Sequence, residues 1–288
     1  MVNLTNLNNF TTMKKSVLLC AAVILMGCTV HVEDVAIAPK TAKTITFDFV
    51  TNVTRSLSAN GSEMTDLFMY DAVDGDYNQS QHLTPSMSTW DAPQMTLGFG
   101  SHNLQFVASR GTGAIEDDES HTITWTKPSD TFWTSKQIEV SGGGEETVSV
   151  VLQRVATRLR VTITDEVPAG TAQIVVTPAT WFYGINYATG AACDSRSESR
   201  VIDIPSSYIG KTGISASIFG MSDADEWTTD VTIEAKNADG DILGRVVLND
   251  VPFKRNRTTE YSGALFTNSG TFSISIDDEW EESYQSNW

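Results

Sequence analysis

Short stretches in which apolar and polar residues alternate recur between residues 44 and 276 of this 288-residue chain. The segment ITFDF begins the series at Ile45, and FSISI ends it at Ile276. A period of two is typical of a strand with one buried face, whereas helical periodicity is absent from every long segment, and a short helical turn is expected only at 206–210. The sequence therefore predicts an all-β protein.

Turn signals separate the predicted strands and place a boundary near the middle of the chain. A glycine-rich loop at 141–146 leads into a strand at 147–152, and a new alternating strand follows directly. Many short strands between turn clusters are typical of β-sandwiches. We therefore predict two tandem β-sandwich domains, 44–153 and 154–280, in a fixed relative orientation. Asn237–Asp241 contains the Asp-Gly pair that favours a hairpin turn.

A short export signal precedes the strands. Two lysines come before the apolar run Ser16–Met26, which is too short to cross a bilayer as a helix. The sequence LMGC that ends this run resembles a lipoprotein site, where the chain is cut between Gly27 and Cys28 and Cys28 is acylated. An ordinary secretory signal with an incidental Cys28 is the alternative. Met13 is the better start, because residues 1–12 are polar and uncharged.

The signal also defines the predicted mature chain. We expect residues 1–27 to be removed, 28–43 to form a lipidated tether and 281–288 to form a C-terminal tail. The net charge of −17 becomes −19 when the two signal lysines leave. This charge argues against nucleic acid and against anionic lipid headgroups as partners. Acyl chains, several of which anchor a protein stably, would then hold it to the outer membrane.

Cysteine content excludes an intramolecular disulfide in the predicted mature chain. Cys20 leaves with the signal and Cys28 is the predicted lipid site, so Cys193 is the one thiol left. No basic neighbour with a matched histidine marks Cys193 as a nucleophile, and we predict an inert thiol. Stability must come from packing.

No residue pattern predicts catalysis, a metal or a cofactor. The histidines lack ligand spacing, and the chain has no HExxH, no phosphate-binding loop and no GxSxG. Solvation explains the acidic runs at 116–119 and 277–279, and neither Asp-Gly-Asp site, 74–76 or 239–241, has the ligand set of an EF-hand. We expect a protein without enzymatic activity, metal or cofactor.

The tryptophans suggest a binding role. Exposed aromatic rings can stack on sugars, and Trp133 and Trp181 lie in dense aromatic stretches. Core packing is the alternative for each tryptophan. If these rings are exposed, the chain is a candidate surface glycan-binding lipoprotein of a nutrient-uptake system.

Three segments together resemble the fimbrillin-like lipoproteins of Bacteroidota. They are DTFWTSKQIEV at 130–140, VVLQRVATRLRVTITDEVPAG at 150–170 and VPFKRNRTTEYSGALF at 251–266. With the lipoprotein site, the resemblance spans nearly the whole mature chain. It implies two transthyretin-like, Greek-key β-sandwiches and no enzymatic activity.

The resemblance also implies a function and a set of partners. The chain would be a cell-surface fimbrial subunit or fimbrial anchor, structural and adhesive, that contacts other subunits by β-strand addition. It would also meet the outer membrane through its lipid, and it would bind a host or bacterial surface ligand.

The resemblance further implies a processing site. Shaft subunits are cut by an arginine-directed protease beyond the first strand, and Arg55, followed by Ser56, fits that position. A solvated loop arginine is the alternative. Anchors keep the lipid uncut, and the sequence leaves both types open.

Overall fold

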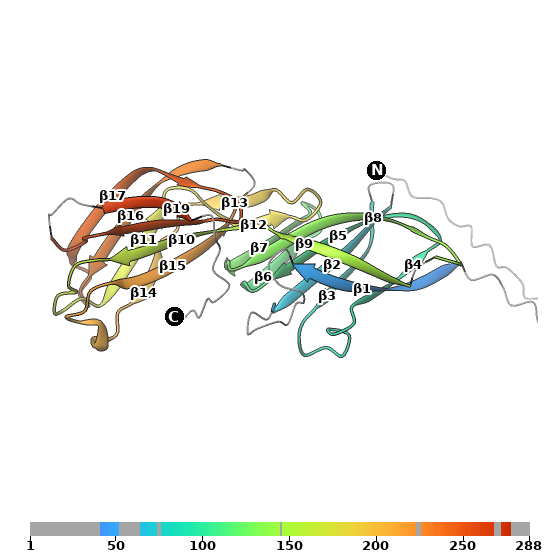
Figure 1. Cartoon of the computed structure of the whole chain (residues 1–288), viewed down its shortest axis with the longest axis horizontal. Helices are drawn as coiled ribbons and strands as arrows, with labels where there is room; N and C mark the ends of the chain where they lie inside the picture. Colours follow the sequence, from blue (N-terminus) through green and yellow to red (C-terminus); the bar gives the residue numbers. More distant parts are fainter. Residues whose placement is uncertain are drawn as a thin grey trace, which may run out of the picture. The chain divides into compact units, whose positions relative to one another are not determined.

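The computed structural model describes residues 41–51, 64–73, 76–144, 146–222, 226–267 and 272–277. Figure 1 shows that nearly all of them lie in strands. The strands are β1 (Ala42–Thr51), β2 (Asp66–Val73), β3 (Asp76–Leu83), β4 (Gln94–Gly98), β5 (Gly100–Ser109), β6 (Thr112–Asp117), β7 (Thr122–Lys127), β8 (Thr131–Val140), β9 (Thr147–Arg154), β10 (Ala156–Ile163), β11 (Gln173–Pro178), β12 (Trp181–Asn186), β13 (Ala192–Arg196), β14 (Arg200–Asp203), β15 (Ile214–Met221), β16 (Trp227–Lys236), β17 (Ile242–Phe253), β18 (Thr258–Gly263) and β19 (Phe272–Asp277). A short 3-10 helix, η1 (Ser206–Tyr208), lies between β14 and β15.

A first β-sandwich is built from one connected set of seven strands, in the order β3-β2-β5-β8-β9-β1-β4. β8 and β9 pair at only two positions, Phe132 with Arg154 and Trp133 with Gln153. From Thr147 to Leu152, β9 pairs with β1 instead. The set is therefore divided into two arms, and side chains from both arms share one hydrophobic core.

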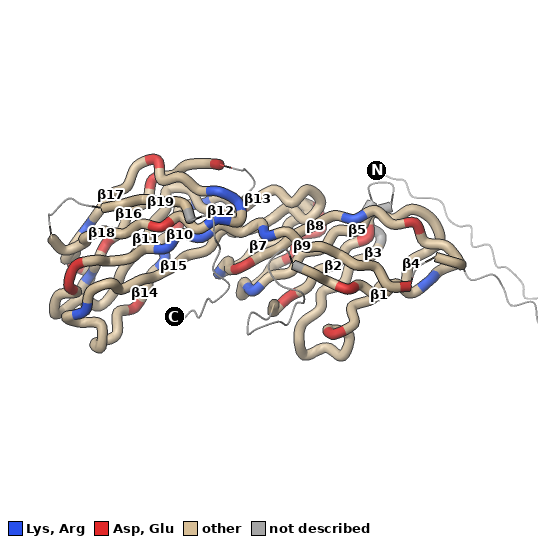
Figure 2. Tube along the Cα trace, in the orientation of Figure 1, with Lys and Arg blue, Asp and Glu red and all other residues tan. Residues whose placement is uncertain are grey.

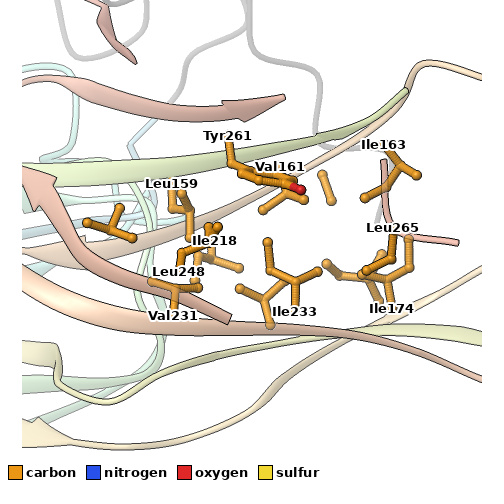
Figure 3. Close-up of a cluster of buried hydrophobic side chains, with 14 of the residues drawn as sticks. Leu159, Val161, Ile163, Ile174, Ile218, Val231, Ile233, Leu248, Tyr261 and Leu265 are labelled. Carbon is orange, nitrogen blue, oxygen red and sulfur yellow. The ribbon is translucent and has the colours of Figure 1, made fainter. Parts of the chain in front are cut away.

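A second sandwich packs an eight-stranded sheet against a four-stranded sheet. The larger sheet has the order β19-β18-β10-β15-β12-β7-β6, with β13 attached to β12, and the smaller one has the order β14-β11-β16-β17. Figure 3 shows side chains from both sheets meeting, among them Leu159 and Val161 opposite Ile233 and Leu248. Burial of such a two-sided core is the main stabilising term of a sandwich.

The hairpin β6–β7 connects the two halves of the chain. Its residues fall inside the predicted first domain, but Thr124 of β7 pairs with Gly184 of β12 in the second sandwich. A third core joins β2 and β5 to β7 and β12, with Tyr70 stacked on Tyr187 at 3.8 Å between ring centroids. The predicted boundary at residue 153 therefore does not separate the sheets. Alternation within a hairpin does not encode which sheet its edge will join.

The predicted all-β sandwich fold is confirmed, and so are two local details. Asn237 closes the β16–β17 hairpin by accepting hydrogen bonds from the backbone amides of Asp239 and Asp241, while Gly240 has φ +90°. The short helical turn expected at 206–210 is η1. Across the part of the chain that the structure describes, no helix has the length and hydropathy of a membrane span.

Candidate functional site

The first strand, β1, lies in the interior of a sheet. It pairs in parallel with β9 from Thr46 to Thr51 and antiparallel with β4 from Ala42 to Thr46. The amide of Phe47 donates a 2.8 Å hydrogen bond to the Pro93 carbonyl. The alternating row of β1, Ile45, Phe47 and Phe49, is buried in the first core. We call the space that β1 fills between β4 and β9 the β1 slot.

Lys43 occupies the N-terminal end of this slot, in the same alternating row as the buried aromatic residues. Its side chain is only 13% exposed, and Nζ donates a hydrogen bond to the Gly144 carbonyl. The Glu146 carboxylate lies 3.8 Å from Nζ and is 82% exposed. An open cavity of about 480 Å³ adjoins this lysine, with a lining that includes Phe99 and Gly142.

The edge strand β4 is fixed to the sandwich by a buried histidine. His102 Nε2 donates to the Gly98 carbonyl at 2.9 Å, and Nδ1 lies 2.8 Å from the carboxylate of Asp71 on β2. Both side chains are almost fully buried. Since Gly98 also pairs with Ala42, this contact stabilises one wall of the β1 slot.

The last described strand, β19, has the same alternating pattern as β1 in a different setting. It pairs only with β18 within the described part of the chain, at the end of the eight-stranded sheet. Phe272 is 49% exposed, and Ile274 and Ile276 are half-buried. A strand with one free edge and a partly exposed apolar row is suited to pairing with another chain.

Asp165 holds the loop that follows β18. Its carboxylate accepts hydrogen bonds of 2.8 to 3.0 Å from the backbone amides of Leu265, Phe266 and Thr267. Partial burial alone would raise the pKa of Asp165, but these amide hydrogen bonds outweigh it, and the pKa lies below its usual value. Asp165 follows the alternating part of the segment 150–170, and its role as an acceptor for three backbone amides explains why an acidic residue lies there.

Four residues of the predicted processing sites lie outside the described residues. They are Gly27 and Cys28 at the signal cleavage and lipid site, and Arg55 and Ser56 at the candidate protease site. The structure does place β1 directly before the segment that contains Arg55, as the sequence pattern predicted.

The two tryptophans of the glycan hypothesis differ in exposure. Trp181 is 0% exposed and its indole nitrogen donates to the Phe219 carbonyl at 2.8 Å, so the prediction of an exposed stacking ring is wrong for this residue. Core packing with Trp227 and Phe253 accounts for its aromatic character. Trp133 is half-buried. A Cβ on Gly190 would lie 2.6 Å from the Trp133 ring, so Gly190 covers one side of that ring.

A buried arginine at the middle of the chain explains one of the sequence motifs. Arg154 forms a two-pronged ion pair with Asp130, at 2.6 and 3.0 Å, and its third nitrogen donates to the side chain of Asn256. Arg255 in the same loop donates to the carbonyls of Ser222 and Gly190. Figure 2 shows basic positions gathered beside β12 and β13, where this loop lies. Arg255 of the KRNR segment therefore links this loop to the β12–β13 turn and to the residue that follows β15.

The titratable groups of the described residues include no metal-binding cluster of three histidine, cysteine or carboxylate groups. Burial raises the pKa of the Cys193 thiol to about 11, helped by the nearby Asp194 carboxylate. The thiol is thus protonated at neutral pH, as expected for an unreactive cysteine.

Solved structures share this fold at low sequence identity. A candidate adhesin from Bacteroides ovatus has a TM-score of 0.53 at 10% identity, over 83% of this chain and 95% of its own. A candidate polysaccharide-binding protein from Bacteroides thetaiotaomicron has a TM-score of 0.53 at 9% identity, over 84% and 99%. The fimbrial anchor protein Mfa2 from Porphyromonas gingivalis is less similar, with a TM-score of 0.46 at 13% identity, over 83% and 98%. The first two show the fold that the fimbrillin resemblance implied.

Sequence comparison gives one family. No curated protein matches the chain. Residues 113–288, more than half of its length, match a family described as a family of unknown function, DUF6562. The matched region starts in β6, so it contains the connecting hairpin together with the whole second sandwich. The chain belongs to the DUF6562 family.

Proposed function

We propose that the chain is a lipid-anchored cell-surface subunit of an adhesive or fimbrial assembly, joined to its neighbours by β-strand addition. The observation that carries this proposal is the position of β1. It is an interior strand with a buried apolar row, yet it is joined to the rest of the fold through the short segment that contains Arg55. A cut in that segment would allow β1 to leave and another strand to fill the slot.

Each end of the chain supplies one contact with a neighbouring subunit in this proposal. Loss of β1 would expose the backbone edges of β4 and β9 together with the side chains that Ile45, Phe47 and Phe49 now cover. An incoming strand must restore both the hydrogen bonds and the apolar row. β19 has a partly exposed apolar row, and one of its edges is unpaired among the described strands, which suits it to contact a neighbouring subunit. The candidate adhesin from Bacteroides ovatus has the same fold, which supports an adhesive role. We propose no enzymatic role.

Assembly can be tested on unboiled membranes from cells that express the full chain. We expect higher-order species on immunoblots, and their loss when residues 272–288 are removed. Removal of the tail 281–288 alone is the matched control, because it leaves β19 in place. Monomer alone under every growth condition would contradict the proposal. Cys28→Ser should separately release the protein from the membrane fraction.

A surface glycan-binding lipoprotein is the second candidate. One observation favours it, since a structure of equal TM-score is described as a candidate polysaccharide-binding protein. Trp133 is the tryptophan left to test, and affinity electrophoresis against polysaccharides should show retardation that Trp133→Ala abolishes. Trp181→Phe, a change in the core, should leave any retardation unchanged.

A further inference from the structure

We infer that the N-terminal end of the β1 slot is a subsite for a basic side chain, which selects the strand that fills the slot. The preferred strand has lysine or arginine two residues before its first buried apolar residue. This inference rests on the proposed strand addition and names the chemistry of the partner.

The groups around Lys43 define the subsite. Its ammonium group meets the Gly144 carbonyl and the Glu146 carboxylate, both from the loop that leads into β9. Neither group is part of β1, so both stay with the slot when the strand is exchanged. A strand with a neutral residue at this place leaves the carbonyl without that donor and the carboxylate without a counter-charge.

The surroundings favour a long cation over other residues. The Lys43 side chain is largely covered, while its ammonium group reaches the exposed Glu146 carboxylate. The adjoining cavity of about 480 Å³ offers room for a side chain as long as arginine. An acidic residue there would face the Glu146 carboxylate and would be repelled.

The chain's own C-terminal strand lacks the basic residue. When Phe272, Ile274 and Ile276 are aligned with Ile45, Phe47 and Phe49, the position of Lys43 falls on Gly270. A second copy of this chain would thus fill the apolar row and leave the subsite empty. The β1 slot therefore favours a strand from a different subunit, with the pattern basic, any residue, then alternating apolar residues.

A nicked form of the full chain tests this selection. A site for a sequence-specific protease is placed between residues 52 and 63, and cleavage leaves β1 held without a covalent bond. Fluorescent peptides then compete with β1 for the slot. The peptides are residues 42–51, the same peptide with Lys43→Ala, Lys43→Arg or Asp48→Ala, and residues 268–278. Asp48 is the matched control, because it is exposed and lies on the opposite face of β1.

We expect the Lys43→Ala peptide and the 268–278 peptide to bind about tenfold more weakly than the 42–51 peptide. The Lys43→Arg and Asp48→Ala peptides should bind within about twofold of it. Glu146→Gln in the protein should reduce the preference for lysine. Equal binding of the Lys43→Ala peptide would overturn the subsite while leaving strand addition intact. Failure of every peptide to enter the slot, including 42–51, would overturn strand addition itself and the subsite with it.

Discussion

The strands at the two ends of the described chain, β1 and β19, share a sequence pattern but not an environment. Phe47 is 2% exposed between two neighbouring strands, whereas Phe272 is 49% exposed on a strand that has one partner among the strands the structure describes. The alternation fixes which side chains lie on one face, and the sheet decides whether that face is covered. We propose that the buried strand β1 is replaced during assembly. The exposed strand β19 contacts a neighbouring subunit.

The largest expected effect comes from shortening the two phenylalanines. Phe47→Ala should lower the free energy of unfolding by about 4 kcal/mol, because a fully buried ring leaves a cavity. Phe272→Ala should cost less than about 1 kcal/mol, since its ring is already half in water. Urea unfolding of both variants measures the difference. Equal losses of unfolding free energy in the two variants would show that β19 is as well buried as β1 and would contradict this comparison.

The next largest loss of unfolding free energy is expected from a change at His102, which holds one wall of the β1 slot. His102→Leu should cost about 3 kcal/mol, because it leaves the buried Asp71 carboxylate without its partner and removes the hydrogen bond to Gly98. Amide exchange should become faster in β4 and β1 before it changes in β19. The exposed His82 is the control, and His82→Leu should change stability by under about 1 kcal/mol. Faster exchange in β19 first would contradict a local role for His102.

A smaller effect concerns the loop between β18 and β19. Asp165→Asn should cost about 1 to 2 kcal/mol at neutral pH, because three amides lose an ionised acceptor. The folded pKa of Asp165 is depressed, so its contribution is present above the ordinary aspartate pKa of about 4 and is lost as pH falls below that value. Between pH 6 and pH 2 the variant should therefore lose less stability than the parent chain. Parallel pH profiles would contradict this assignment.

Much of the fold could be predicted because its strands are encoded locally. Alternation located β1, β10 and β19, and the Asp-Gly turn located the β16–β17 hairpin. β3 is a different case, since its sequence DYNQSQHL is mostly polar, with Tyr77 and Leu83 far apart, and it forms an edge strand by pairing with β2. A polar edge strand has no periodic signal to find.

Contacts between distant segments account for what the sequence could not show. The hairpin β6–β7 joins the second sandwich through β12, and Trp181 is buried by Trp227 and Phe253. Lys43 meets Gly144 across the sheet, about a hundred residues away in sequence. The segments around Arg154 and Asn256 form part of a sequence pattern, but only the structure shows that Arg154 binds both Asp130 and Asn256.

The central claim is that β1 leaves its slot when subunits assemble, and the N-terminus of the assembled protein tests it directly. Higher-order species purified from the cell surface should begin at Ser56 and should lack residues 42–51 by mass spectrometry, while the membrane-bound precursor begins at an acylated Cys28. An acylated Cys28 and an uncut β1 in every species would contradict the claim.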